Sequence, residues 1–225
     1  MNASSFHAAE VAPSTEVALQ RTLAAVPLAS RSGDPWLSAV LANPLALLDD
    51  HAQCELKAAA NALSMVARHP EHEILVRRMS SLAKEEMHHY RIVRHALLER
   101  GGTATRLAAN PYMKEIGRGR LGGEFALLDD LVLAALIEAR SCERFVVLAS
   151  ALVGNSSSDV ALSELYARLA RSESGHARLF LDLARALFEE ARVQTEVARR
   201  VTQESEVLRR LPATARMHGG MAASN

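Results

Sequence analysis

Along most of the chain, apolar residues return every three or four positions, which is the spacing of the buried face of an amphipathic α-helix. Turn-forming residues interrupt this pattern, so that it predicts five long helices. Their approximate ranges are 44–68, 71–100, 124–152, 159–190 and 193–210. The fifth is more charged than the others. The pattern therefore predicts an all-α protein, a four-helix bundle with extra flanking helices.

The strength of the pattern divides the chain into three parts. Residues 1–34 are weakly patterned, and we expect a partly flexible N-terminal arm with a short helix from Pro13 to about Leu23. Residues 35–210 form the helical domain, and Asp34-Pro35 resembles a helix start, with an N-cap residue followed by proline. Residues 211–225 contain proline, glycine and methionine, and we expect an irregular C-terminal tail there.

The connection between the second and third long helices is long for a helix bundle. Gly101-Gly102 ends the second helix, and we expect a loop over residues 101–123. This loop holds a cluster of basic side chains, namely Arg106, Lys114, Arg118 and Arg120. Loops of this length are uncommon and often functional, so the segment is a candidate for ligand binding.

One short motif occurs twice within the helical pattern. Residues 82–89 and residues 169–176 both read Leu-Ala-basic-x-Glu-x-x-His. Residues three positions apart share a face of a helix, so each glutamate points the same way as its histidine. The pairs are Glu86 with His89 and Glu173 with His176. A single copy would be a weak signal, whereas two copies in the same frame predict one shared site.

Each copy also has a glutamate upstream on an apolar helix face. Glu55 precedes Glu86 by 31 residues, and Glu138 precedes Glu173 by 35 residues. Each separation fits a long helix, a turn and a return to the same height in an antiparallel neighbour. A second alignment of the two halves pairs Glu55 with Glu143 instead. We prefer Glu138 because its face is more uniformly apolar, and leave open whether Glu143 replaces or joins it.

Four carboxylates in one helical core would be very costly without compensating cations. Two Glu-x-x-His helices, together with one glutamate from each of two other helices, form the ligand set of di-iron carboxylate bundles. Carboxylate and imidazole ligands without thiolate suit iron or manganese better than zinc, and two ferrous ions can supply electrons to O2. The predicted metal ligands, which are also the predicted catalytic residues, are Glu55, Glu86, His89, Glu138, Glu173 and His176.

Composition excludes several classes of protein. The 225 residues include 26 Lys plus Arg and 26 Asp plus Glu, so the net charge is zero and no global basic signature for nucleic acid exists. The two cysteines, Cys54 and Cys142, are too few for a disulfide framework. No stretch approaches the ~20 apolar residues of a membrane span, and no leader pattern is visible. We therefore expect a cytoplasmic protein that does not bind membranes, with its oligomeric state left open.

Four segments of the sequence resemble a known family in more than the spacing of the predicted metal ligands. They are residues 47–59 (Leu-Leu-Asp-Asp-His-Ala-Gln-Cys-Glu-Leu-Lys-Ala-Ala), residues 82–89, residues 137–145 (Ile-Glu-Ala-Arg-Ser-Cys-Glu-Arg-Phe) and Ser172-Glu173-x-x-His176. Together they resemble the MiaE family, the tRNA 2-methylthio-N6-isopentenyladenosine hydroxylases, which have a ferritin-like fold. Residues 137–145 are the most specific part, because generic ferritin-like proteins share only the metal spacing. The resemblance covers about residues 35–220.

The resemblance implies an O2-dependent hydroxylation of the isopentenyl group on the modified adenosine next to the anticodon of tRNA. The six ligands would then hold two iron ions, and an external donor of ferredoxin type would supply electrons. Arg106, Lys114, Arg118, Arg120 and Arg216 are candidates for contacts with tRNA phosphates, because of their clustering. Ser174-Gly175 departs from the family, which tends to have Ala-Arg before the second histidine.

Three other functions use the same residues. A ferroxidase or mini-ferritin would store iron beyond two ions per chain, and the match in residues 137–145 argues against it. A di-iron oxygenase acting on a small apolar metabolite is compatible with the neutral net charge. A non-enzymatic bundle, in which the glutamates and histidines only pair with each other, predicts that Glu86→Ala leaves metal content unchanged.

Overall fold

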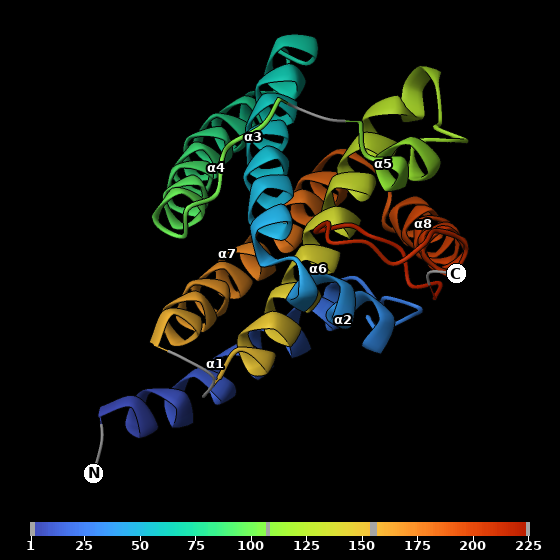
Figure 1. Cartoon of the computed structure of the whole chain (residues 1–225). Coiled ribbons are helices and arrows are strands. Elements are labelled where there is room, and N and C mark those ends of the chain that lie inside the picture. Colours follow the sequence, from blue (N-terminus) through green and yellow to red (C-terminus); the bar gives the residue numbers. More distant parts are fainter. Residues whose placement is uncertain (1–2, 107–108, 154–156, 224–225) are drawn as a thin grey trace.

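Four long helices form the centre of the molecule and pair as two antiparallel hairpins (Figure 1). One hairpin consists of α3 (Pro44–Arg68) and α4 (Glu73–Glu99), and the other consists of α6 (Ala126–Ala151) and α7 (Ser157–Leu187). Helix α4 also packs against α7 and so links the two hairpins. This arrangement confirms the predicted all-α four-helix bundle.

The computed structural model describes residues 3–106, 109–153 and 157–223. Within these ranges, five shorter or peripheral elements flank the bundle. They are α1 (Ala3–Ala25), α2 (Asp34–Ala42), α5 (Pro111–Ile116), the 3-10 helix η1 (Gly123–Phe125) and α8 (Glu190–Arg210). Helix α1 packs against α6 and α7, while α8 packs against α5, α6 and α7. None of the helices in the described ranges has the length and apolar character needed to cross a membrane.

Proline in the first turn marks the start of α2, α3 and α5, where its missing N–H removes no helical hydrogen bond. At α5, the Oδ1 atom of Asn110 also accepts the N–H of Tyr112 at 3.0 Å and caps the helix. The prediction of a simple loop over residues 101–123 is therefore wrong, because α5 and η1 lie within it. The Asn-Pro start of α5 is the same signal that marks α3.

Helix α1 starts at Ala3, well before the predicted start at Pro13. Its C-terminal half is held against the bundle by buried side chains and hydrogen bonds. The hydroxyl of Thr22 lies 3.2 Å from Cys142 Sγ, and the hydroxyl of Ser174 donates to the carbonyl of Ala18 at 3.0 Å. Ser174, one of the two departures from the family pattern, therefore anchors α1 to α7.

Buried apolar side chains form two clusters at different heights in the bundle. The first includes residues 62–65 of α3, 75–83 of α4, 127–139 of α6 and 177–184 of α7. The second includes residues 47–52, 93–97, 142–149 and 162–170 of the same four helices. The order of the clusters along the chain reverses from each helix to its antiparallel neighbour. Both copies of the Glu-x-x-His motif and both upstream glutamates consequently lie at the level between the clusters.

The C-terminal tail is fastened to the bundle by Arg144 of α6. This fully buried arginine donates to the carbonyl oxygens of Met217 and Gly219, the second at 2.8 Å. Its guanidinium carbon lies 4.3 Å from the centre of the Trp36 ring, a cation–π arrangement. The tail is irregular, as predicted, apart from an isolated β-bridge between Pro212 and Ala222.

Two glycine substitutions, one in the packed tail and one in α7, should change the free energy of unfolding in opposite directions. A Cβ atom on Gly220 would lie 1.9 Å from the carbonyl oxygen of Leu211, whereas one on Gly175 would meet nothing within 4 Å. We expect Gly220→Ala to lower the free energy of unfolding by about 1–3 kcal/mol through overpacking. Gly175→Ala, within α7, should raise it by about 1 kcal/mol through helix propensity. Urea unfolding followed by circular dichroism measures both, and equal stability of the two variants would contradict the packing of the tail.

Candidate metal centre

All six predicted ligand residues meet in one buried layer between the two apolar clusters. They form two groups, and within each group the ligand atoms lie within 4.8 Å of one another. The first group contains Glu55, Glu86, His89 and Glu173, and the second contains Glu86, Glu138, Glu173 and His176. Glu86 and Glu173 belong to both groups. The arrangement is that of two adjacent metal positions with two shared carboxylates.

The atoms of Glu86 show how one carboxylate serves both groups. Its Oε2 atom lies 3.4 Å from Nδ1 of His89, and its Oε1 atom lies 2.8 Å from Nδ1 of His176. Glu173 is placed in the same way. Its Oε1 atom lies 3.6 Å from Nδ1 of His89, and its Oε2 atom lies 3.1 Å from Nδ1 of His176. Both histidines present Nδ1, the same ring nitrogen. The two copies of the motif are therefore equivalent in geometry as well as in sequence.

The site is too charged to be explained as a set of internal ion pairs. Glu86 is 1% exposed, and its oxygens meet the two histidines in contacts that lack hydrogen-bond geometry. Oε1 of Glu173 and Nδ1 of His89 also lack a contact of hydrogen-bond geometry among the described residues. Burial raises the pKa of Glu86, and burial together with the neighbouring Glu173 raises the pKa of Glu138 well above its usual value. Unpartnered oxygens that converge in a buried layer fit two divalent cations, which would supply the missing positive charge.

Side chains behind the ligands orient two of them. His51, which is completely buried, places Nε2 2.6 Å from Oε1 of Glu55. Glu85 lies 3.4 Å from Nε2 of His176 and accepts a hydrogen bond from the hydroxyl of Ser172 at 2.7 Å. A carboxylate on the far nitrogen of a metal-binding histidine fixes the ring and its tautomer. From the sequence, His51 is expected either at the surface or behind a ligand, and the structure shows that it lies behind Glu55, one helical turn away.

Glu143, the alternative to Glu138, faces away from the metal centre. Its carboxylate accepts hydrogen bonds from Arg140 at 3.0 Å and from the N–H and hydroxyl of Ser32 at 2.8 and 2.7 Å. Arg140 also donates to both carboxylate oxygens of Glu204 on α8, at 2.7 and 2.9 Å. The carboxylate of Glu143 thus holds the connection between α1 and α2, and the structure places Glu138 in the buried layer.

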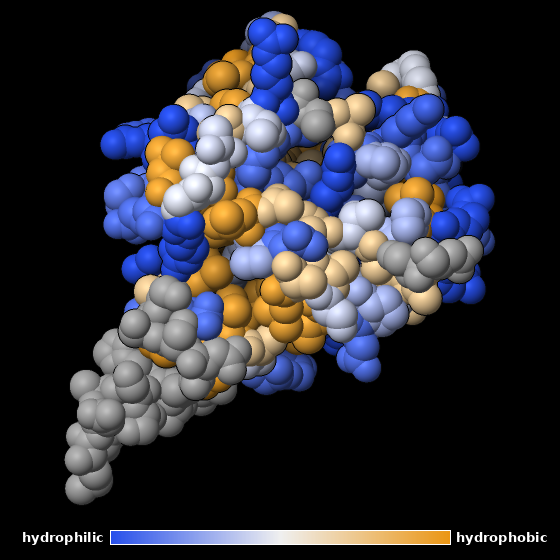
Figure 2. Space-filling view, viewed as in Figure 1, coloured by the Kyte–Doolittle hydropathy of each residue, from blue (hydrophilic) through white to orange (hydrophobic). Residues whose placement is uncertain are grey.

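A pocket of about 180 Å³ leads from the surface to Glu138. It opens between α3 and the segment containing α5, where Figure 2 shows a hollow in this face of the molecule. Most of its wall is apolar, with Ala58 from α3 and Leu133, Ala134 and Ile137 from α6. The pocket gives an apolar substrate a path to one side of the metal layer.

The tail completes the wall of this pocket with His218. The imidazole stacks on Tyr112 of α5 with ring centres 5.0 Å apart, and its Nε2 lies 3.3 Å from the hydroxyl of Ser141. Burial and the nearby charge of Arg144 lower the pKa of His218 to about 3, so the ring is neutral. Periodicity could not find this residue, because the tail has no helical pattern.

Three of the predicted phosphate contacts are already engaged within the protein. Arg118 pairs with Glu115 at 2.8 Å, and Arg120 pairs with Asp130. Arg216 donates to the carbonyl of Ala109 at 2.9 Å. Arg106 and Lys114 are exposed. The five do not form one patch of free cations.

Comparison with known proteins gives matches over most of the chain. The family model described as tRNA-(MS[2]IO[6]A)-hydroxylase (MiaE) matches residues 24–219. The tRNA 2-(methylsulfanyl)-N(6)-isopentenyladenosine(37) hydroxylase of Pseudomonas putida is 40% identical, over 64% of this chain and 67% of that protein. The Salmonella typhimurium protein of the same name is 31% identical, over 58% of this chain and 64% of that protein. The chain thus spans about two thirds of each relative.

One solved structure supports the fold independently. It is described as Protein 43 with aldehyde deformylating oxygenase activity from Synechococcus and has a TM-score of 0.79 with this chain. The two are 31% identical, and the match covers 88% of this chain and 98% of that one. The likeness confirms the predicted ferritin-like bundle.

Metal binding to this site should release protons. Burial opposes the charged form of His89, yet its contacts with Glu55 and Glu86 raise its pKa to about 10, so the metal-free imidazole is protonated at neutral pH. Raised pKa values of Glu86 and Glu138 add to the protons held by the empty ligands. We expect apparent ferrous or manganous affinity to rise about tenfold per pH unit for each proton released. Calorimetry in buffers of different ionisation enthalpy checks this, and an affinity independent of pH would contradict it.

His51→Leu should weaken metal binding without unfolding the protein. The substitution removes the hydrogen bond that orients Glu55, and loss of such an outer contact typically costs about 10–100-fold in metal affinity. His95→Leu is the matched control, because His95 is exposed on α4 and pairs only with Glu99. Competition titration with a metal indicator distinguishes them. Equal affinity in the two variants would remove His51 from the site.

Proposed function

The chain belongs to the MiaE family of tRNA hydroxylases, and on that premise we propose that it hydroxylates the isopentenyl group of 2-methylthio-N6-isopentenyladenosine next to the anticodon of tRNA. The observation that carries the proposal is the match over residues 24–219, which includes both Glu-x-x-His copies and both upstream glutamates. The buried layer of shared carboxylates at the end of an apolar pocket supplies the physical basis.

We infer that the metal is iron, held by the six residues of the two groups. Glu86 and Glu173 would be shared by both ions, Glu55 and His89 would complete one site, and Glu138 and His176 the other. Carboxylate and imidazole without thiolate fit iron, and the sulfur of Cys54 belongs to neither group. Iron bound there would supply the activation of O2, with two electrons from an external donor of the ferredoxin type. Overall, one oxygen atom enters a C–H bond and the other leaves as water.

The protein itself contributes binding, orientation and exclusion of water. A pocket of about 180 Å³ exceeds the ~150 Å³ of apolar cavities that accept benzene, so a five-carbon prenyl group fits within it. Its apolar wall holds that group beside Glu138 and keeps bulk water from the site. The modified adenosine must be splayed out of the anticodon loop to reach the pocket, as other base-modifying enzymes require.

A second candidate is an oxygenase that acts on a small apolar molecule. The observation in its favour is the Synechococcus structure, whose description gives aldehyde deformylating oxygenase activity, and which matches 88% of this chain. The pocket wall would accept an alkyl chain as readily as a prenyl group. The two candidates differ in whether the protein needs RNA.

Mass spectrometry of nucleosides tests the proposed reaction. The protein is loaded anaerobically with ferrous iron, then given reductant, air and tRNA that carries the prenylated adenosine. We expect one added oxygen atom on that nucleoside with the wild type and none with Glu86→Ala, which loses a carboxylate shared by both metal positions. Glu99→Ala is the control, because this glutamate is exposed on the same helix.

Two other results would change the assignment. An unmodified nucleoside together with consumption of a long-chain aldehyde would establish the small-molecule oxygenase. Accumulation of iron beyond two ions per chain, with no oxygen added to either substrate, would favour the ferroxidase.

A further inference from the structure

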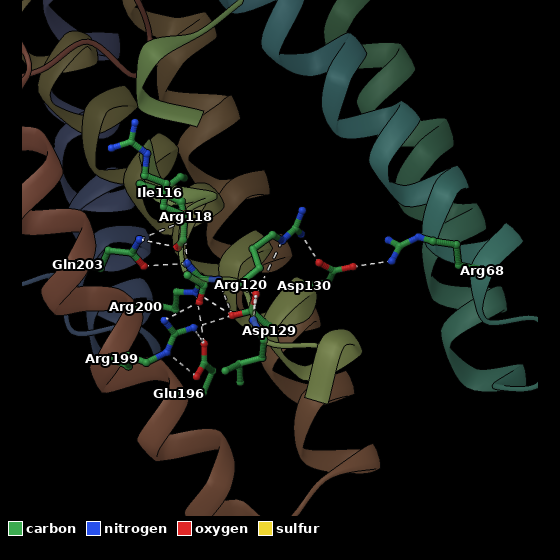
Figure 3. A network of polar contacts seen from close by, with 12 residues as sticks. Arg68, Ile116, Arg118, Arg120, Asp129, Asp130, Glu196, Arg199, Arg200 and Gln203 are labelled. Atoms are coloured by element: carbon green, nitrogen blue, oxygen red, sulfur yellow. Dashed lines mark hydrogen bonds and ion pairs between the residues drawn. The ribbon is translucent and has the colours of Figure 1, made fainter. Parts of the chain in front are cut away.

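In the wall of the pocket, one buried carboxylate is shared by two arginines (Figure 3). Asp130 of α6, whose side chain is 8% exposed, accepts from Nη1 of Arg68 at 2.7 Å through one oxygen. Its other oxygen pairs with Nη2 of Arg120. Arg68 is in the last turn of α3, and Arg120 precedes η1, so Asp130 ties two separate segments together beside the pocket that it lines with Arg120.

The neighbouring carboxylate, Asp129, is bound in a different way. It faces α8, where Arg200 is 1% exposed and donates to it through Nε at 2.8 Å. Arg199 donates to the same carboxylate at 2.8 Å. Asp129 therefore stays paired with the buried Arg200 even when the exposed arginines change partners. The ion pairs of Asp130, in contrast, involve two arginines that reach into solvent.

The exposure of these arginines allows exchange of partners. The side chains of Arg68 and Arg120 are 45% and 51% exposed, and half-exposed ion pairs contribute little to stability. Because Asp130 has two arginines, one of them can leave without stranding a buried charge. Arg120 also lies 3.8 Å from Asp129 and is the better placed to stay. Arg68 has no other ion pair among the described residues.

The distance to the metal layer fits a nucleotide. Asp130 lies eight residues before Glu138 on α6, which corresponds to ~12 Å along the helix. A purine nucleotide, extended from its phosphate to the end of an N6 substituent, has a comparable length. Lys57 and Asn61 of α3 line the pocket between these two levels, on the same helix face as Arg68.

We propose that Arg68 is a phosphate ligand for the substrate RNA, and that Asp130 occupies it until the RNA binds. The proposal rests on the proposed function and extends it by naming a phosphate site. When the RNA binds, a backbone phosphate replaces Asp130 as the partner of Arg68, and Arg120 alone neutralises Asp130. Guanidinium binds phosphate through two parallel hydrogen bonds, which a single carboxylate oxygen does not offer.

Binding of a prenylated anticodon stem-loop RNA to the metal-loaded protein tests the exchange. Arg68→Gln should weaken binding about tenfold and lower the slope of log affinity against log salt by about 1, as expected for one lost phosphate contact. Asp130→Asn keeps the shape of the side chain but releases the arginine, and should tighten binding several-fold. In the Arg68→Gln/Asp130→Asn double variant, that gain should disappear.

The control is Arg94→Ala, because Arg94 is exposed near the other end of the α3–α4 hairpin. It should leave affinity and salt slope unchanged. Metal content and helical circular dichroism of each variant report whether the bundle is intact.

Two results would overturn the phosphate site. One is an unchanged affinity and salt slope in Arg68→Gln, and the other is a gain from Asp130→Asn that persists without Arg68. Either result with a wild-type protein that hydroxylates tRNA would leave the proposed function in place. A wild type that binds the RNA through Arg68 but adds no oxygen would overturn the reaction and keep the site.

Discussion

Repulsion among four buried carboxylates is the constraint around which this bundle is built. The four glutamates and two histidines occupy one level, and apolar clusters above and below them keep most of the charges away from bulk water. Without cations, this level holds unpartnered oxygens and protonated imidazoles, a costly arrangement for a protein core. Metal binding and folding are therefore coupled, because the ions supply the charge that the apolar clusters exclude.

A second set of charges surrounds the first and serves a different purpose. Arg140 and Arg144 are as deeply buried as the ligands, but each is matched to oxygen acceptors. Arg140 holds α8, and Arg144 holds the tail that carries His218 into the pocket wall. The four central helices thus make the candidate metal centre, whereas these arginines attach α8 and the tail, and the tail completes the pocket wall.

The parts of the structure that follow from local periodicity could be predicted from the sequence. The spacing of apolar residues predicted the four central helices. The two copies of Glu-x-x-His, with their upstream glutamates, predicted six residues at one level, where the structure has them. The early start of α1 was missed because its pattern is weak, and α5 because only Asn110-Pro111 signals a helix of six residues. The segment from Arg216 to Gly220 resembles the family's tail, but the place of His218 in the pocket wall could not be predicted, since it depends on a long-range contact between the tail and Arg144. The orienting role of His51 also required the structure, because surface and buried histidines look alike in a sequence.

The attachment of the tail has a consequence for the order in which the protein is made. All six metal-site residues lie between Glu55 and His176, whereas the last wall of the pocket comes from His218. Synthesis runs from the N-terminus, so the four central helices, which end at Leu187, are made before the segment that closes the pocket. During that interval the carboxylate layer is open on the side that His218 later covers. The pocket is therefore complete only when the end of the chain has been made and residue 218 is in place.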